Sequence, residues 1–388
     1  MKKILCMILT VLLIAALTAC SSEAQTSESA AESDAPSRLI IVPKPEASSA
    51  GSSETAESSD QETASKPEEP LVQIADMTNM NLLTGLPTLS EQAIGKRPVA
   101  VMVNNIPQAL PQYGISDADI IFEIPVEADI TRLMAVYGDY TKVPNVCSIR
   151  SCRYYYPILA VGFDAFYVHC GTDPTVAKET LRRLGVDRID GAFADYGLFE
   201  RDQSRVNQGY AVEHTLTFYG TGLASALEND DVRIDLKEDK RKPAFLFAEN
   251  GKEVVPNGEN AESINIFFSG YSDVDFRYNT ETGTYDKWMN GEAHMDAVTG
   301  KQLSFENVIL LETAIGVRDN KGRKDVDVYG GSSSVGYFAS KGKIQKIHWE
   351  KPGDFDYLSF TDESGNPVAI NRGKTYIAFD YPDRVTYK

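Results

Sequence analysis

The sequence predicts an α+β fold, with an N-terminal domain built on a mixed α/β sheet and a mainly β C-terminal domain. Two patterns support this prediction. Apolar runs of strand length alternate with helical segments over roughly 90–230, whereas 231–388 shows short strands and hairpins with little helical periodicity. The chain has 388 residues and is 42% hydrophobic, which suffices for packed cores in two or three domains.

The first twenty residues are organised like a secretory signal peptide. Lys2 and Lys3 precede an apolar run over 4–17, which at about 14 residues is too short to span a bilayer. The run ends in Leu-Thr-Ala-Cys, which resembles the lipobox of bacterial lipoproteins. This resemblance implies cleavage before Cys20, lipidation of its thiol, and anchoring on the extracytoplasmic face of the cell membrane. The alternative is a secreted protein with a chance cysteine at the cleavage site.

Residues 21–80 are expected to form a disordered, acidic tether rich in Ser and Glu. This segment holds twelve acidic and three basic residues, and it contains no aromatic residue. It therefore has too little apolar surface to offset the entropy of ordering its chain.

The N-terminal domain is expected over 81–240. Four apolar runs are typical of buried strands: 98–103, 119–124, 133–137 and 164–169. Three segments favour helices: 152–161, 174–184 and 222–228. Asp173 followed by Pro174 is a common start for a helix.

The C-terminal domain is expected over 241–388, after the charged, weakly patterned stretch 229–242. Asn290-Gly291 separates two alternating runs and is the strongest short-range signal of a hairpin. Further strands are predicted at 308–313, 334–338, 344–349 and 375–379.

Polar side chains gather at the ends of the predicted N-terminal strands. Six of them form the candidate ligand-binding site: Asn104, Glu127, Arg132, Arg150, Arg153 and His169. Ligands of open α/β sheets bind at the carboxyl ends of the strands. Arginines suit a carboxylate or phosphate there, because the guanidinium can donate two parallel hydrogen bonds.

These residues also admit other interpretations. Glu123 or Glu127 could work with His169 as an acid–base pair. Alternatively, the arginines could pair with the two glutamates and only stabilise the sheet ends. His294 is expected at the surface, and Tyr154–Tyr156 are expected to pack as part of a helix rather than to stack on a sugar.

Three cysteines lie in the folded part of the chain: Cys147, Cys152 and Cys170. An extracytoplasmic location would permit a disulfide between Cys147 and Cys152, while unpaired thiols remain the other possibility. With His169 they match no standard zinc pattern, so no metal site is predicted.

Charge and missing motifs narrow the function. A net charge of −18 argues against a nucleic-acid partner. The chain has no G-x-S-x-G, S-x-x-K, H-E-x-x-H or P-loop motif, and no cofactor is indicated. Whether the protein is an enzyme stays open at this stage.

An ordered run of short motifs covers residues 82–388. In the N-terminal part they are Leu-Leu-Thr-Gly-Leu at 82–86, Arg-Pro-Val-Ala-Val-Met-Val-Asn-Asn at 97–105, Asp-Ala-Asp-Ile-Ile-Phe-Glu at 117–123, Glu-Ala-Asp-Ile-Thr-Arg at 127–132, Ser-Ile-Arg-Ser at 148–151 and Asp-Ala-Phe-Tyr-Val-His at 164–169. In the C-terminal part they are Asn-Gly-Glu-Ala-His at 290–294, Thr-Gly at 299–300 and Gly-Tyr-Phe at 336–338. In these motifs the chain resembles the YerB family of bacterial lipoproteins. That resemblance implies a two-part α+β fold with layered sheets, and it implies no established reaction.

The leading hypothesis is a lipid-anchored, extracytoplasmic binding or accessory protein of the cell envelope. Its partners would be the membrane, through the lipid on Cys20, and an anionic or glycan-type ligand of the wall or envelope. One alternative is an envelope hydrolase or transferase that uses a Glu/His pair. The other is a scaffold for a membrane or wall enzyme.

Overall fold

A computed structural model of the chain describes residues 75–388, apart from 194–196 and 231. The expected signal peptide, Cys20 and nearly all of the expected tether lie outside these residues. The packed body begins before residue 81, because Met80 is only 3% exposed and belongs to a core cluster. Among the described helices, none has the length and apolar character needed to cross a membrane.

The described elements follow the predicted order. The N-terminal part contains β1 (Val99–Asn104), β2 (Ile120–Pro125), β3 (Thr131–Tyr137), β4 (Asn145–Cys147), α1 (Tyr155–Gly162), β5 (Phe166–His169), α2 (Val176–Leu184), β6 (Arg188–Asp190), β7 (Phe199–Arg201), α3 (Gln203–Asn207), β8 (Leu216–Tyr219) and α4 (Leu223–Asn229). The C-terminal part contains β9 (Glu259–Asn260), β10 (Ser263–Ser269), β11 (Ser272–Asn279), β12 (Thr284–Met289), β13 (Glu292–Ala293), β14 (Ser304–Phe305), β15 (Asn307–Glu312), β16 (Ile315–Val317), β17 (Lys324–Val326), β18 (Gly330–Ser340), β19 (Lys343–Glu350), β20 (Ser359–Thr361), β21 (Thr375–Asp380) and β22 (Val385–Tyr387).

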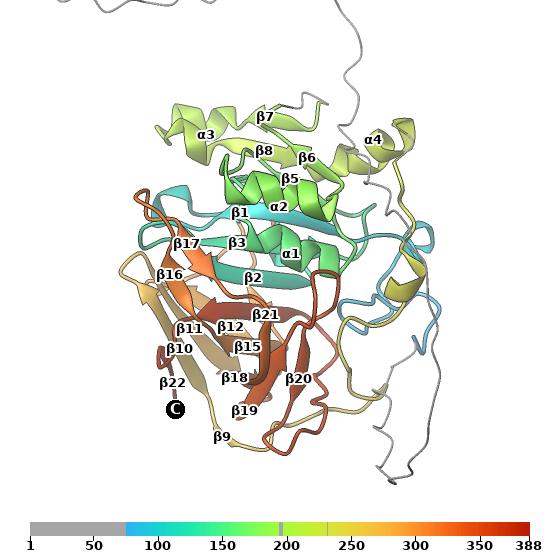
Figure 1. Cartoon of the computed structure of the whole chain (residues 1–388), viewed down its shortest axis with the longest axis vertical. Helices are drawn as coiled ribbons and strands as arrows, with labels where there is room; N and C mark the ends of the chain where they lie inside the picture. The colour runs from blue at the N-terminus through green and yellow to red at the C-terminus, as the bar shows by residue number, and fades with distance from the viewer. Residues whose placement is uncertain (1–74, 194–196, 231) are drawn as a thin grey trace, which may run out of the picture. The chain divides into compact units, whose positions relative to one another are not determined.

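One large sheet joins the two parts of the chain. Its strand order is β20-β19-β18-β15-β21-β2-β3-β1-β5-β6, with β9 paired to β19, and Figure 1 shows the succession from β5 through β2 and β21 to β18. The junction is a parallel pair of β2 and β21, in register from Ile120 opposite Thr375 to Glu123 opposite Ala378. The two halves of the sequence therefore complete each other's sheet.

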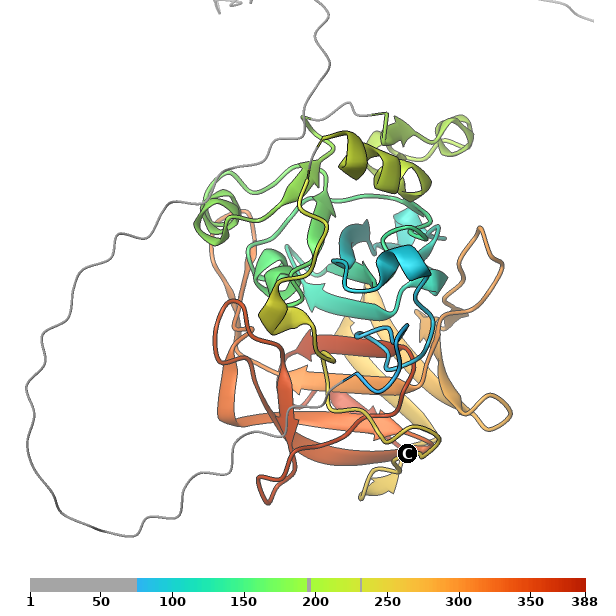
Figure 2. The ribbon, with the colours of Figure 1, turned by 90° about the vertical axis from the view of Figure 1, so that its right-hand side faces the viewer.

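Both faces of this sheet are covered, which confirms the α+β fold with layered sheets. Phe122 and Met134 face α1 and α2, whereas the alternating residues Ile121 and Leu133 face the second sheet. That sheet has the order β13-β12-β11-β10-β22, with β14 paired to β12. Figure 2 shows α1 and α2 on one side of the large sheet and the second sheet on the other. Burial on both faces explains why β1–β3 are nearly continuous apolar runs.

Local signals confirm several predicted elements. Asn290 and Gly291 adopt positive φ of 52° and 82°, and they turn β12 into β13 as the hairpin signal predicts. Asp173 accepts hydrogen bonds from the backbone N–H of Thr175 at 3.0 Å and of Ala177 at 3.4 Å, but α2 begins at Val176, so Thr175 rather than Asp173 occupies the N-cap position.

The shared sheet predicts that the described body unfolds as one unit. Replacing Phe122 with Ala, which empties a fully buried site on β2, should destabilise the chain by about 3–5 kcal/mol. Calorimetry should show a single transition that moves to lower temperature. Val317→Ala, at a position 65% exposed, is the control and should leave that transition in place. Two transitions, of which Phe122→Ala moves only one, would contradict the shared sheet.

Candidate functional site

The loop between β4 and α1 crosses the carboxyl ends of β1 and β5. The N–H of Asn104 donates to the carbonyl of Ser148 at 2.9 Å, and the N–H of Arg150 donates to that of Met102 at 3.1 Å. The carbonyl of Arg150 in turn accepts from the N–H of Cys170 at 3.1 Å, just after β5. These bonds hold the two arginines of the loop at the sheet edge where Asn104 and His169 end their strands.

Glu127 is clamped there by two guanidinium groups. Arg153 donates from Nε and Nη2 to the two carboxylate oxygens, each at 2.7 Å, and Arg132 donates to Oε1 as well. Although burial opposes ionisation, the charges of Arg132 and Arg153 lower the pKa of Glu127 below its usual value. The Glu127 and Arg153 side chains are 22% and 11% exposed, so the cluster reaches solvent.

Arg150 differs from these two arginines. Its guanidinium is half-buried, and within the described residues no carboxylate lies within ion-pair distance of it. Burial lowers the pKa of Arg150. The negative charges of Glu127 and Glu213 nearby oppose this shift. Glu127 is therefore shared by Arg132 and Arg153, whereas Arg150 feels the charges of Glu127 and Glu213 without forming a close ion pair to a described carboxylate.

His169 lies at the end of β5, with its side chain fully buried. Its Nδ1 lies 2.9 Å from the carbonyl of Gly171, so Nδ1 carries the proton and Nε2 is left as an acceptor. Burial lowers the pKa of His169 and so favours the neutral ring, although the charge of Asp190 acts in the opposite direction.

Unpartnered polar atoms concentrate at this edge. Buried side-chain atoms without a hydrogen-bond partner in the described part of the chain include Asn104 Oδ1, Arg132 Nε, Ser148 Oγ, Arg150 Nε and His169 Nε2. Buried polar groups are normally hydrogen-bonded, so each exception needs an explanation. Five such atoms lie on three adjacent strands and one loop, all of them buried from solvent.

The six predicted residues are thus brought to one edge of the sheet, but in separate contacts. Glu127, Arg132 and Arg153 form one ion-paired group. Asn104 contacts His214 instead, with 2.9 Å between its Nδ2 and Nδ1 of the ring. The expectation that arginines pair with the glutamates is confirmed for Arg153 and Glu127.

The structure also contains a buried ion pair that sequence reasoning missed. Glu123 and Lys287 are both fully buried, with 3.2 Å between Oε2 and Nζ, and they link β2 of the large sheet to β12 of the second sheet. The remaining lone pairs of Glu123 accept hydrogen bonds of 2.8–2.9 Å from four side chains: Asn105, Thr131, Ser272 and Tyr376.

A chain of hydrogen bonds leads from this pair to the candidate site. Lys287 Nζ lies 2.9 Å from His294 Nδ1, and His294 Nε2 lies 2.8 Å from Gln112 Oε1. Gln112 Nε2 then donates to the carbonyl of Asn104 at 3.0 Å. The expectation that His294 lies at the surface is wrong, because its ring contacts Lys287 and Gln112 and the residue is only 3% exposed.

Other expectations have clear outcomes. Tyr155 and Tyr156 are fully buried in α1, and their hydroxyls donate to backbone carbonyls of β2 and β3, so the helix-packing interpretation is confirmed for them.

Cys147, Cys152 and Cys170 are free thiols, the first two buried. In the described ranges no group of three or more His, Cys, Asp or Glu side chains is placed to hold a metal ion.

Comparison with known proteins identifies the relatives of this fold. The family described as "Protein of unknown function (DUF3048)" matches with its N-terminal domain at residues 83–233 and its C-terminal domain at 264–377. A Bacillus subtilis (strain 168) protein named "Putative lipoprotein YerB" is 30% identical over 272 residues, covering 69% of this chain and 77% of that protein. The chain belongs to the YerB family. The crystal structure of YerB from Bacillus subtilis superposes with a TM-score of 0.68 at 27% identity, covering 79% of this chain and 98% of the YerB chain.

The buried pair in this YerB-family fold predicts a non-additive response to mutation. Lys287→Met should cost about 3–5 kcal/mol of stability, because it leaves the Glu123 carboxylate buried without a cation. Adding Glu123→Gln should restore part of that loss, so the double variant should be more stable than the two single losses imply. Chemical denaturation of the four proteins measures this coupling.

Lys96→Met is the matched control, because Lys96 forms an exposed pair with Asp235, with side chains 27% and 60% exposed. That substitution should cost less than about 1 kcal/mol. Strictly additive effects of Lys287→Met and Glu123→Gln would show that the two groups do not act as a pair.

Proposed function

We propose that this protein is a lipid-anchored, extracytoplasmic binding or accessory protein that binds an anionic or glycan-type ligand at the edge formed by β1, β3 and β5. The observation that carries the proposal is the guanidinium of Arg150, which forms no close ion pair to a described carboxylate and lies among unpartnered buried polar atoms. An Arg side chain without a carboxylate partner supplies up to five donors in a fixed plane. A carboxylate or phosphate on the ligand would satisfy both its charge and its geometry.

The neutral groups at the edge favour a ligand that carries hydroxyl or amide groups in addition to an anionic group. Asn104 Oδ1 and His169 Nε2 are buried, unpartnered acceptors that would complement hydroxyl or amide N–H groups of a ligand for which the edge opens. An acidic sugar offers both chemistries at once, since its carboxylate would meet Arg150 and its hydroxyls would meet the acceptors. This combination supports a wall or envelope polymer as the ligand.

The proposed location rests on the sequence and on the relative's name. The Leu-Thr-Ala-Cys motif ends at Cys20, and the Bacillus subtilis relative is named a lipoprotein. Two acyl chains on one cysteine would hold the protein stably on a membrane, which a single chain does only weakly. An acidic tether over 21–80 would then extend and carry the folded body away from the lipid surface.

The anchor predicts a change of cell fraction. Cys20→Ala should move the chain from the membrane fraction to the soluble fraction or the medium, and should abolish its labelling by radioactive palmitate. Cys6→Ala, within the same leader, is the control and should remain labelled. Wild-type chain that carries no lipid label would contradict the anchor without affecting the ligand site.

The ligand site predicts that Arg150→Gln weakens binding of an acidic sugar. With N-acetylmuramate as the probe in calorimetric titrations, the dissociation constant should rise about tenfold or more, since a charge-assisted hydrogen bond contributes about 1.5–3 kcal/mol. The melting temperature should hardly change, because Arg150 makes no ion pair within the described residues.

Arg182→Gln is the matched control, because Arg182 is 65% exposed and pairs only with Glu179 on the surface of α2. It should bind the probe like the wild type. Equal binding by the wild type and Arg150→Gln, or no binding by the wild type to N-acetylmuramate or phosphate, would remove the support for this site.

The enzyme alternative gains less from the geometry. Glu127 is held ionised by two arginines and is a poor proton donor at neutral pH, while Glu123 is fully buried. Turnover of wall polymer that is lost in Glu127→Gln but kept in Arg150→Gln would favour that alternative. A scaffold would instead retain its partner in both variants.

A further inference from the structure

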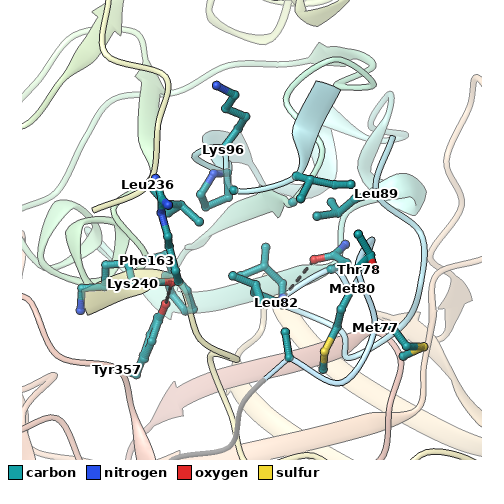
Figure 3. A pocket seen from close by; sticks show the side chains of 18 residues that line it. Met77, Thr78, Met80, Leu82, Leu89, Lys96, Phe163, Leu236, Lys240 and Tyr357 are labelled. Atoms are coloured by element: carbon teal, nitrogen blue, oxygen red, sulfur yellow. Dashed lines mark hydrogen bonds between the residues drawn. The ribbon is translucent and has the colours of Figure 1, made fainter. Parts of the chain in front are cut away.

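A separate cavity of about 260 Å³ lies at the start of the described chain. None of the six predicted site residues lines it. Its walls come from the segment before β1, from the end of α1, from the stretch after α4 and from Tyr357, as Figure 3 shows. Its apolar lining residues include Met77, Met80, Leu82, Phe163 and Leu236.

The walls of this cavity are held in place by packing. Phe163 and Leu236 are 3% and 7% exposed, and the ring of Phe163 lies 5.6 Å from that of Tyr357. The Tyr357 hydroxyl donates to the backbone carbonyl of Lys240 at 3.3 Å. Leu82, by contrast, is half-exposed within the apolar lining (Figure 3). A preformed apolar cavity with a reachable wall favours binding of an apolar group.

The charged residues that line the cavity are all cationic. Lys96, Lys240 and Arg241 line it, and none of the described Asp and Glu residues does, in a chain of net charge −18. Among the residues that the structure describes, the ion pair of Arg241 is with Glu238, at 3.5 Å, with side chains 48% and 88% exposed. Such a solvated pair is weak, so Arg241 can turn to another anion. Lys96 forms a closer pair with Asp235 at 2.7 Å.

We propose that this cavity binds the acyl chain of a single-chain anionic amphiphile, a medium-chain fatty acid, with its carboxylate near Arg241. The apolar walls match a hydrocarbon chain, and the cationic residues match the headgroup. A volume of about 260 Å³ is just below the ~300–1,000 Å³ of typical ligand pockets, which favours a short chain over a diacyl lipid. Met77 and Met80 can adjust to the chain, because Met is unbranched and flexible. This site is independent of the proposed edge site at Arg150.

Calorimetric titration of the full chain with three ten-carbon amphiphiles tests the proposal. Decanoate, decyl maltoside and decyltrimethylammonium share the tail and differ in headgroup charge; each is used below its micelle concentration. Decanoate should bind saturably with one site per chain, decyl maltoside at least fivefold more weakly, and decyltrimethylammonium more weakly still. No saturable decanoate binding, or equal binding of the three, would overturn the proposal.

Two variants locate the site. Leu82→Asp places a carboxylate on the apolar wall and should abolish decanoate binding, whereas Val255→Asp, at a position 57% exposed and outside the lining, should not. Arg241→Gln should weaken decanoate binding about fivefold and leave decyl maltoside unchanged, with Arg182→Gln as its control.

A third variant covers the case in which Leu82→Asp fails to fold. Thr78→Trp blocks the cavity from an exposed lining position and should also abolish binding. Decanoate binding that survives Thr78→Trp in a folded protein would place the amphiphile elsewhere. Vesicles of phosphatidylglycerol should not compete with decanoate; competition would identify a membrane lipid as the ligand and overturn the assignment to a free fatty acid.

Discussion

The buried contact between Glu123 and Lys287 is the constraint on which the arrangement of the two sheets depends. Removing both charges from water is costly, and the cost is offset only when the pair is close and its other hydrogen-bonding positions are filled. Here four side chains complete the shell of Glu123. A shift of β2 by one residue would turn Glu123 toward the helices and place an apolar residue opposite Lys287. The pair thus specifies one register for β2.

This constraint extends to the candidate site. Gln112 is bonded on one side to His294, which contacts Lys287, and on the other to the backbone of Asn104. Asn105 connects the same two regions, because its side chain donates to Glu123 and accepts from Gln112. The end of β1 is therefore held by groups that are themselves held between the sheets. Such support keeps binding groups in position before a ligand arrives.

The sequence predicted what depends on local pattern. Strands β1, β2, β3 and β5 are buried on both faces, so their apolar runs are visible without structural information. Asn104 and His169 end β1 and β5, as the predicted strands imply, and the loop that carries Arg150 crosses the same edge; that these residues bind a ligand stays a prediction. Which of these side chains form ion pairs could not be predicted. Glu127 pairs with Arg132 and Arg153 but not with Arg150, and the distances between these side chains depend on the three-dimensional fold. The boundary near residue 240 stays a prediction, and the sheet that crosses it is not visible in the sequence.

The buried pair escaped prediction because its members are far apart along the chain. One signal was present: Lys287 alternates with Tyr285 and Met289, and all three point to the buried face of β12. A lysine on the apolar face of a predicted strand requires a carboxylate partner. Periodicity cannot name that partner, since it comes from a strand of the other sheet.

The charge distribution gives the proposed edge site its character. The chain as a whole is strongly acidic, so its long-range field does not draw an anion toward it. At physiological ionic strength this repulsion is screened beyond roughly 8 Å, and local groups decide the outcome. Arg150 then acts at short range and in a partly buried setting, where one guanidinium interacts more strongly than it would in water. A ligand that also hydrogen-bonds to Asn104 and His169 would gain over a bare ion, so we expect the proposed site to prefer an acidic sugar to inorganic phosphate.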